Sequence, residues 1–192
     1  MPLPMTLTFK PLSAELLPDY LDFFDRRAFT DNPRWAGCYC YFPLHDPKTI
    51  NWATRTAAEN RSAVSDAVGA RTARGVLAYA GEQVVGWCNA GPWSQFPMLA
   101  DVPEADPQHT GAILCFIVAP DWRGRGVARG LLDAACNDLR AQGLRTARAR
   151  AVRSSDPARN HLGPWSMYLS AGFVVVGDIG ESETLGRKSL ES

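Results

Sequence analysis

A glycine-rich turn between an apolar run and an amphipathic segment is the part of this 192-residue sequence best suited to chemistry. The turn, Arg123 to Ala128, reads Arg-Gly-Arg-Gly-Val-Ala and follows the apolar run Ala112 to Ala119. Backbone N–H groups at the start of a helix bind anions, the helix dipole strengthens them, and glycines let the backbone approach a ligand closely. The sequence therefore predicts an anion site at this turn, flanked by the positive charges of Arg123, Arg125 and Arg129.

Two common phosphate-binding motifs do not fit the turn. A Walker loop requires a lysine followed by Ser or Thr after its second glycine, and none is present. The dinucleotide fingerprint G-x-G-x-x-G matches Gly124 and Gly126 but meets Arg129 where it needs a third glycine. The acidic residue expected about 20 positions further on is also missing, because the next strand carries Arg148 and Arg150. A nucleotide-binding protein of another kind is the weaker alternative.

The turn does fit R-x-x-G-x-A, and here the sequence resembles the GCN5-related N-acetyltransferase family. The acetyl-coenzyme A signature of that family is [R/Q]-x-x-G-x-[G/A], placed between a strand and a helix. Residues 168 to 173 read Tyr-Leu-Ser-Ala-Gly-Phe, which is similar to a second family element, Y-x-x-x-G-F, at the end of a short helix. The resemblance is specific over residues 112 to 176 and topological before them.

The resemblance implies acetyl-coenzyme A as co-substrate. Its pyrophosphate would bind the amides of the turn, and its pantetheine arm would pair like an added strand with the backbone before the turn. The family's sheet is splayed there, which corresponds to a separation between residues 113–118 and 146–152. A backbone N–H near Val118 would stabilise the oxyanion formed when an amine attacks the acetyl carbonyl directly. The coenzyme-binding residues implied in this way are Phe116, Ile117, Val118, Arg123, Gly124, Arg125, Gly126, Val127 and Ala128.

Tyr168 corresponds to the family's general acid, which protonates the departing thiolate. The residues alone leave a second interpretation open, because Tyr168 shares its surroundings with Trp165 and Leu169 and would also serve as a core tyrosine. Many relatives place an asparagine seven residues before this tyrosine. His161 stands there instead, with Asn160 one place away, so a coenzyme contact from an asparagine side chain is in doubt.

The general base is not evident from the sequence. Many relatives carry a glutamate on the strand before the turn, whereas residues 114 to 116 read Leu-Cys-Phe and offer no carboxylate. An amine near neutral pH is mostly protonated, so a group must accept its proton, directly or through water. His109, Asp106 and His161 are the candidates.

Residues 34 to 45, RWAGCYCYFPLH, lie where the family's variable substrate-binding segment belongs. Cys38, Cys40 and His45 lack the paired spacing of a structural zinc site, so no metal is expected. Aromatic side chains would either wall a pocket for an apolar or aromatic amine or pack as core; they are Trp35, Tyr39, Tyr41, Phe42, Trp87 and Trp93. Core positions are expected for the remaining cysteines, Cys88, Cys115 and Cys136.

Hydrophobic periodicity and turn residues predict a mixed α/β fold. Strands are expected at residues 6–10, 76–80, 83–90, 112–119, 144–152, 173–179 and 184–190, and helices at 13–27, 51–73, 164–171 and from 127 to a stop at Gly143. The resemblance implies a single mixed, largely antiparallel central sheet flanked by helices, which is the acyl-coenzyme A N-acyltransferase fold. Residues 1–192 are expected to form one N-acetyltransferase domain, with an acetyl-coenzyme A core at about 76–190 and a variable substrate-side segment at about 11–75.

Composition limits the classes of function. The balance of 20 basic and 20 acidic residues disfavours a nucleic-acid binder. This balance conceals an asymmetry. Nine arginines and three aspartates give residues 123 to 159 a net charge of +6, so the rest of the chain carries a net charge of −6. The acidic remainder suits a cationic acceptor. No apolar run is long enough to cross a bilayer and the N-terminus lacks a signal peptide, so we expect a cytoplasmic protein without membrane contact.

The leading hypothesis is an enzyme that acetylates an amine of a small molecule or a protein. The alternative is a module that binds acyl-coenzyme A as a sensor without turnover, which the missing carboxylate favours and Tyr168 disfavours. The sequence does not identify the acceptor. It specifies no interface either, so a homodimer stays open.

Overall fold

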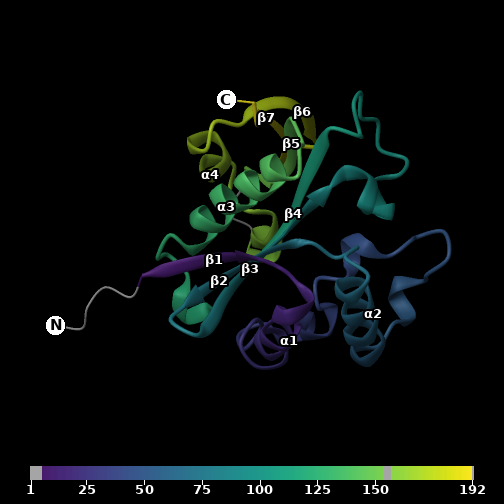
Figure 1. Ribbon diagram of the computed structural model, residues 1–192. Coiled ribbons are helices and arrows are strands. Elements are labelled where there is room, and N and C mark those ends of the chain that lie inside the picture. The colour runs from purple at the N-terminus through teal and green to yellow at the C-terminus, as the bar shows by residue number, and fades with distance from the viewer. Residues whose placement is uncertain (1–5, 154–156, 192) are drawn as a thin grey trace.

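Seven strands form one mixed sheet in the order β1-β2-β3-β4-β5-β7-β6 (Figure 1). This computed structural model describes residues 6–153 and 157–191, so the N-terminal residues considered for a signal peptide lie outside it in part. All neighbouring strands pair antiparallel except β4 and β5, which are parallel. The strands are β1 (Leu7–Pro11), β2 (Gly75–Ala80), β3 (Gln83–Pro92), β4 (Thr110–Val118), β5 (Thr146–Val152), β6 (Val174–Ile179) and β7 (Glu183–Ser189).

Helices cover both faces of the sheet (Figure 1). They are α1 (Leu17–Arg26), α2 (Ala57–Gly69), α3 (Val127–Ala141) and α4 (Trp165–Ser170). Alternate side chains of β2 point to opposite faces, so Val76 and Ala78 pack with α3 while Leu77 and Tyr79 pack with α1 and α2. No helix within residues 6–153 and 157–191 is long and apolar enough to cross a bilayer.

The elements agree with the sequence-based expectation except at the boundaries of two helices. The helix expected over 13–27 is α-helical only from Leu17 to Arg26, after a 3₁₀ turn at Ala14–Leu16. The expected helix over 51–73 begins only at Ala57, because the Thr56 hydroxyl accepts from the Glu59 N–H and the Glu59 carboxylate accepts from the Thr56 N–H. This capping box fixes the helix start, and residues 52–54 before it form a separate 3₁₀ turn. The mixed sheet flanked by helices is confirmed.

Pairing between the parallel strands β4 and β5 stops halfway. The register runs from Thr110 opposite Thr146 to Ile113 opposite Ala149, although β4 continues to Val118. On its other side, β4 shifts register against β3, so that Leu114 has no partner. The end of β5 instead pairs with the segment just before α4, because the Val152 N–H donates to the Gly163 carbonyl at 3.0 Å. The second half of β4 therefore has an edge free of β5.

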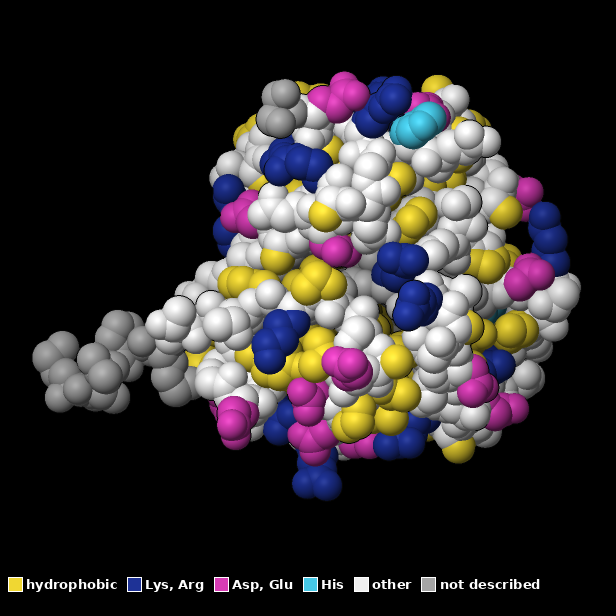
Figure 2. Space-filling view, viewed as in Figure 1, with side chains coloured by type: hydrophobic (Ala, Val, Ile, Leu, Met, Phe, Trp, Pro, Cys, Tyr) yellow, Lys and Arg dark blue, Asp and Glu magenta, His cyan; other side chains and the backbone are white. Residues whose placement is uncertain are grey.

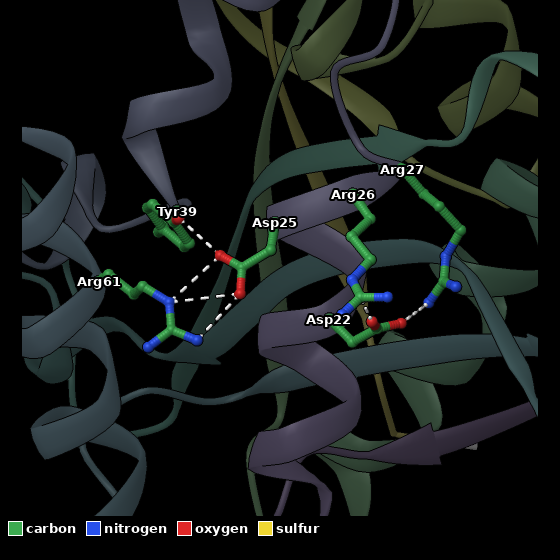
Figure 3. A network of polar contacts seen from close by, with 6 residues as sticks. All are labelled: Asp22, Asp25, Arg26, Arg27, Tyr39 and Arg61. Atoms are coloured by element: carbon green, nitrogen blue, oxygen red, sulfur yellow. Dashed lines mark hydrogen bonds and ion pairs between the residues drawn. The ribbon is translucent and has the colours of Figure 1, made fainter.

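A polar network fastens α1 and α2 to the loop between them (Figure 3). The Tyr39 hydroxyl donates to Asp25 of α1 at 2.7 Å, and Arg61 of α2 forms an ion pair with the same carboxylate at 2.9 Å. The Tyr20 hydroxyl donates to the Tyr39 carbonyl at 2.6 Å. The hydrogen bond from Arg61 lowers the pKa of Asp25 below its ordinary value, so the network is ionised at neutral pH. The loop is thereby held while Tyr39 and Cys40 both adopt the left-handed backbone region, at φ 48° and 49°.

Candidate active site

The glycine turn leaves the first amides of α3 without a side-chain cap in the described structure. Gly124 and Gly126 adopt φ values of 72° and 80°, a region that glycine reaches without steric cost. The first turn of α3 lies close to β3 because Gly86 has no side chain: a Cβ there would lie 2.8 Å from Val127 Cγ1. Sequence and packing together thus present bare N–H groups at a rigidly placed helix start, which is an anion site by its chemistry.

A cavity of about 550 Å³ opens over this turn and beside the free edge of β4. We call it the turn cavity. Eight of the nine residues expected to bind coenzyme line it: Phe116, Ile117, Val118, Arg123, Gly124, Gly126, Val127 and Ala128. Its other walls include Asp31, Asn32, Trp35, Trp122, Asn160, His161, Gly163 and Pro164. The structure therefore brings the expected residues together around one space, although what that space binds stays a prediction.

Arg125, the ninth residue, does not line the cavity. Its guanidinium lies 5.3 Å from the centre of the Trp122 ring, in a cation–π arrangement on the surface. Arg129, by contrast, does line the cavity, and it also donates to the Ser170 carbonyl at 3.1 Å. The three arginines around the turn therefore differ in what they offer a ligand.

Arg123 is paired with a carboxylate that sequence reasoning did not find. Its terminal nitrogens bind both oxygens of Asp31, at 2.5 and 3.1 Å, and its Nε donates to the Val118 carbonyl at 3.2 Å. The hydrogen bond from Arg123 lowers the pKa of Asp31, which keeps that carboxylate ionised at neutral pH. Asp31 follows α1 by a few residues and stands 92 positions from Arg123, so no local pattern pointed to the pair.

Tyr168 lies beneath the turn cavity and is not among its lining residues. Its side chain is fully buried, and its hydroxyl donates to the Leu162 carbonyl at 2.8 Å. The ring packs against Phe116 and Phe173, with ring centres 6.2 and 5.2 Å away. Burial raises the pKa of Tyr168 well above its ordinary value. The structure thus places this tyrosine in the core, and its role as general acid stays a prediction.

Of the three candidate bases, only His161 lies at the cavity. His109 Nδ1 is 2.9 Å from an Asp106 oxygen just before β4 begins, and neither residue lines the cavity. The His161 ring stands at 87° to the Trp35 ring, with centres 5.2 Å apart. His161 comes from the segment that joins β5 to α4, opposite the free edge of β4.

A second cavity, of about 380 Å³, adjoins the first. We call it the loop cavity, because the loop from Arg34 to Pro43 forms much of its wall. Four residues line both cavities: Phe29, Trp35, Ile117 and His161. The remaining lining residues are Arg34, Gly37, Cys38, Cys40, Phe42, Pro43, Trp52, Arg55, Ala57, Asn60 and Cys115. The two cavities therefore meet at the unpaired half of β4.

The aromatic residues expected at a pocket divide between pocket and core. Trp35 and Phe42 line the loop cavity, where Trp52, which the sequence had not singled out, joins them. Trp87 and Tyr39 are buried in the core between the sheet and α1. Aromatic composition alone could not separate these two groups, because both surround the same irregular loop.

Two cysteines meet at the floor of the loop cavity. The Asn89 amide donates to Cys40 Sγ at 3.5 Å, and interaction with the neighbouring Cys115 thiol is the largest cause of the lowered pKa of Cys40. The same hydrogen bond to Cys40 raises the pKa of Cys115. Burial raises the pKa of Cys38 to about 12. Contact between the two thiols therefore shifts their pKa values in opposite directions.

Most of the arginines between residues 123 and 153 are paired with carboxylates. The pairs are Arg123 with Asp31, Arg129 with Asp133, Arg145 with Glu191, Arg148 with Glu104, Arg150 with Glu183 and Arg153 with Asp178. Basic and acidic side chains are accordingly interspersed over the face seen in Figure 2. Basic and acidic residues that are separated along the sequence therefore lie side by side in the fold.

The chain belongs to the acetyltransferase (GNAT) family. The sequence profile of that family matches residues 41–173, which include the turn, the free edge of β4 and Tyr168. No curated protein sequence matches the chain significantly. The family assignment accounts for the class of reaction and leaves the acceptor open.

Solved structures share the fold at low sequence identity. An N-acetyltransferase from Staphylococcus aureus Mu50 is 16% identical, covers 97% of this chain and 99% of its own, and has a TM-score of 0.59. The PaiA N-acetyltransferase from Thermoplasma acidophilum, in complex with coenzyme A, is 15% identical, covers 96% of this chain and 99% of its own, and has a TM-score of 0.57. The putative acetyltransferase yncA from Salmonella typhimurium, with its cofactor acetyl-CoA, is 16% identical, covers 97% of this chain and 95% of its own, and has a TM-score of 0.54. At these identities the likeness is one of fold.

The Arg123–Asp31 pair generates the first prediction, which concerns anion binding. Replacing Asp31 with Asn removes an ionised carboxylate from the mouth of the turn cavity and releases the charge of Arg123. We expect the affinity for inorganic pyrophosphate to rise by about 3-fold to 10-fold at low salt, and the gain to shrink at high salt. Isothermal titration calorimetry at two ionic strengths measures both effects.

The matched control is Asp22→Asn, which breaks the ion pairs of Asp22 with Arg26 of α1 and with Arg27 just after it (Figure 3). None of these residues lines either cavity. Pyrophosphate affinity should be unchanged in this variant. Weaker binding in Asp31→Asn would contradict the prediction, because it would mean that Asp31 holds Arg123 in the position that binds the anion.

Proposed function

We propose that this protein transfers the acetyl group of acetyl-coenzyme A to a primary amine by direct attack in a ternary complex. The observation that carries the proposal is the separation of β4 from β5 after Ile113, directly above a glycine turn with uncapped helix amides. An extended ligand arm needs an unpaired strand edge, and a pyrophosphate needs backbone donors at the end of it. The GNAT family membership of the chain supports the same reaction class.

The residues at the turn cavity suit this co-substrate. Gly124 and Gly126 provide a backbone cradle with open space above it, since a Cβ at either position would meet nothing within 4 Å. Arg123 and Arg129 line the same space and supply positive charge. When bound there, acetyl-coenzyme A supplies an activated acyl group, and the free edge of Phe116 to Val118 supplies the pairing for its arm.

The proposed mechanism assigns a proton acceptor at the junction of the two cavities. His161 lines both of them, so it faces a ligand in either one. It accepts the proton of the attacking amine, directly or through one water molecule. An amide of the unpaired half of β4 stabilises the oxyanion, since no β5 partner occupies that edge. Tyr168 supplies the proton to the thiolate, which requires its hydroxyl to leave the Leu162 carbonyl.

The second candidate function is a sensor that binds acyl-coenzyme A without turnover. It is favoured by one observation, the complete burial of Tyr168 with its hydroxyl bound to Leu162. A tyrosine held in this way acts as a core residue and donates no proton to a leaving group.

Thiol release separates the two functions. The protein is incubated with acetyl-coenzyme A and a panel of amines, and free thiol is measured over time. Amine-dependent release with formation of the N-acetyl product supports the transferase. Tight coenzyme binding with no turnover on any amine, and only slow hydrolysis, supports the sensor.

Gly126 tests the coenzyme site. Valine at this position cannot adopt φ 80° without strain, and its side chain would occupy the space above the turn. We expect Gly126→Val to weaken acetyl-coenzyme A binding by at least about 10-fold, measured by calorimetry.

Gly180→Val is the control, because Gly180 has a similarly positive φ of 62° and open surroundings at the β6–β7 turn. It should show a comparable loss of thermal stability with coenzyme affinity unchanged. Equal affinities in the Gly126 variant and the wild type would refute the site.

Tyr168→Phe tests the general acid. Removing the hydroxyl leaves the Leu162 carbonyl without its donor, at a cost of about 1 kcal/mol in the free energy of unfolding. We expect the acetyl-transfer rate to fall while coenzyme affinity is nearly unchanged, measured at a temperature where both proteins are folded. A wild-type rate would assign Tyr168 to the core alone.

His161→Gln tests the general base, with His109→Gln as its matched control outside the cavities. We expect kcat/KM of His161→Gln to fall by about 100-fold at neutral pH, and the loss to shrink at alkaline pH, where more of the amine is already deprotonated. The pH–rate profile measures both. A uniform loss at all pH values, or an equal loss in His109→Gln, would argue against a base at this position.

A further inference from the structure

The loop cavity adjoins the site of acetyl transfer and contains positive charge only. Arg34 and Arg55 line it, and no aspartate or glutamate is found among its described lining residues. A cationic polyamine or a lysine-rich peptide would meet two guanidinium groups there with no carboxylate to offset them. The negative surplus elsewhere in the sequence, which suited a cationic acceptor, is therefore not located at this cavity.

Arg55 is held in place by a buried amide. Its Nε donates to Asn60 Oδ1 at 2.5 Å, and Asn60 Nδ2 donates to the Gly37 carbonyl at 2.8 Å. Asn60 is only 3% exposed, so this support is part of the core. The guanidinium also lies 5.1 Å from the centre of the Tyr41 ring. These contacts restrain the arginine before any ligand binds, which lowers the entropic cost of binding.

The charge of Arg55 has no carboxylate partner in the described part of the chain. Its terminal nitrogens form no hydrogen bond there, and Arg55 forms no ion pair. Glu59 interacts with Arg55 electrostatically, but its carboxylate accepts from the Thr56 N–H at 2.7 Å and from the Thr56 hydroxyl at 2.8 Å. A guanidinium with Nε engaged and its terminal nitrogens open is suited to bind a carboxylate.

Aromatic side chains form the rest of the binding surface. The rings of Phe42 and Trp52 meet edge to face, with centres 4.9 Å apart, and Trp35 closes the side toward His161. A volume of about 380 Å³ is near the lower end of the range for small-molecule sites. The cavity therefore fits one small, mostly apolar molecule.

We infer that the loop cavity binds the acceptor, and that the acceptor is a small primary amine with a carboxylate on an apolar or aromatic body. The carboxylate binds Arg55, the body packs against Trp35, Phe42 and Trp52, and the amine faces the junction at His161. This inference rests on the proposed acetyl transfer, but binding in the cavity is measurable without turnover.

The test compares amines that differ only in the carboxylate. Phenylalanine is compared with phenethylamine, and 4-(aminomethyl)benzoate with benzylamine, with spermidine as a polycation. Binding is followed by quenching of tryptophan fluorescence, and transfer by thiol release in the presence of acetyl-coenzyme A. We expect at least one carboxylated amine to show an affinity and a transfer rate about 10-fold to 100-fold higher than those of the matching amine without the carboxylate.

Arg55→Gln should abolish that preference while acetyl-coenzyme A affinity stays at the wild-type value. Arg55→Lys keeps the positive charge but loses the planar guanidinium that can bind a carboxylate through two nitrogens. It should retain only part of the preference for carboxylated amines. The control is Arg26→Gln, which removes an exposed arginine on α1. If Arg55→Gln fails to fold, Arg55→Lys and the ligand pairs on wild-type protein still decide the outcome.

Failure of the inference and failure of the proposed function give different results. Transfer to amines without preference for a carboxylate, or best with spermidine, would overturn the inference and leave the transferase standing. Binding of carboxylated amines that depends on Arg55, with no transfer to any of them, would support the cavity assignment and refute the transferase. An unchanged preference in Arg55→Gln overturns the inference in either case.

Discussion

The end of pairing between β4 and β5 is the constraint on which the rest of the site depends. A parallel pair continues until something prevents it, and here Leu114 has no partner on β3 while β5 turns away to pair with the segment at Gly163. Four residues of β4 beyond Leu114 then present backbone groups to a cavity. The glycine turn, the loop and the segment around His161 are all built around this edge, and both cavities meet at it.

Local sequence patterns predicted most of the fold. The strands and helices follow from periodicity, and the glycine turn follows from residues that are neighbours in the chain. The start of α2 was predicted too early because residues 51 to 56 are compatible with a helix, while the Thr56–Glu59 capping box starts it later. The splay was implied by family resemblance, since no residue pattern in either strand signals where pairing stops.

Contacts between distant segments could not be predicted in this way. Asp31 lies 92 residues from Arg123, and nothing in either neighbourhood indicates the other. Support of Arg55 by Asn60 and Tyr41 depends on a loop whose path is set by the Asp25 network and by left-handed backbone at Tyr39. Composition likewise gave the number of arginines near the turn but not their partners, which come from several other elements.

The pairing of those arginines also affects how fast a ligand arrives. Long-range attraction of a polyanion requires a field that extends into solvent, and a cation beside a carboxylate is seen from a distance as a dipole. At the turn itself, Arg123 and Arg129 are paired in this way, which shortens the range of their field. The association rate constant of a phosphorylated ligand should therefore depend less on ionic strength than it would if both arginines were unpaired.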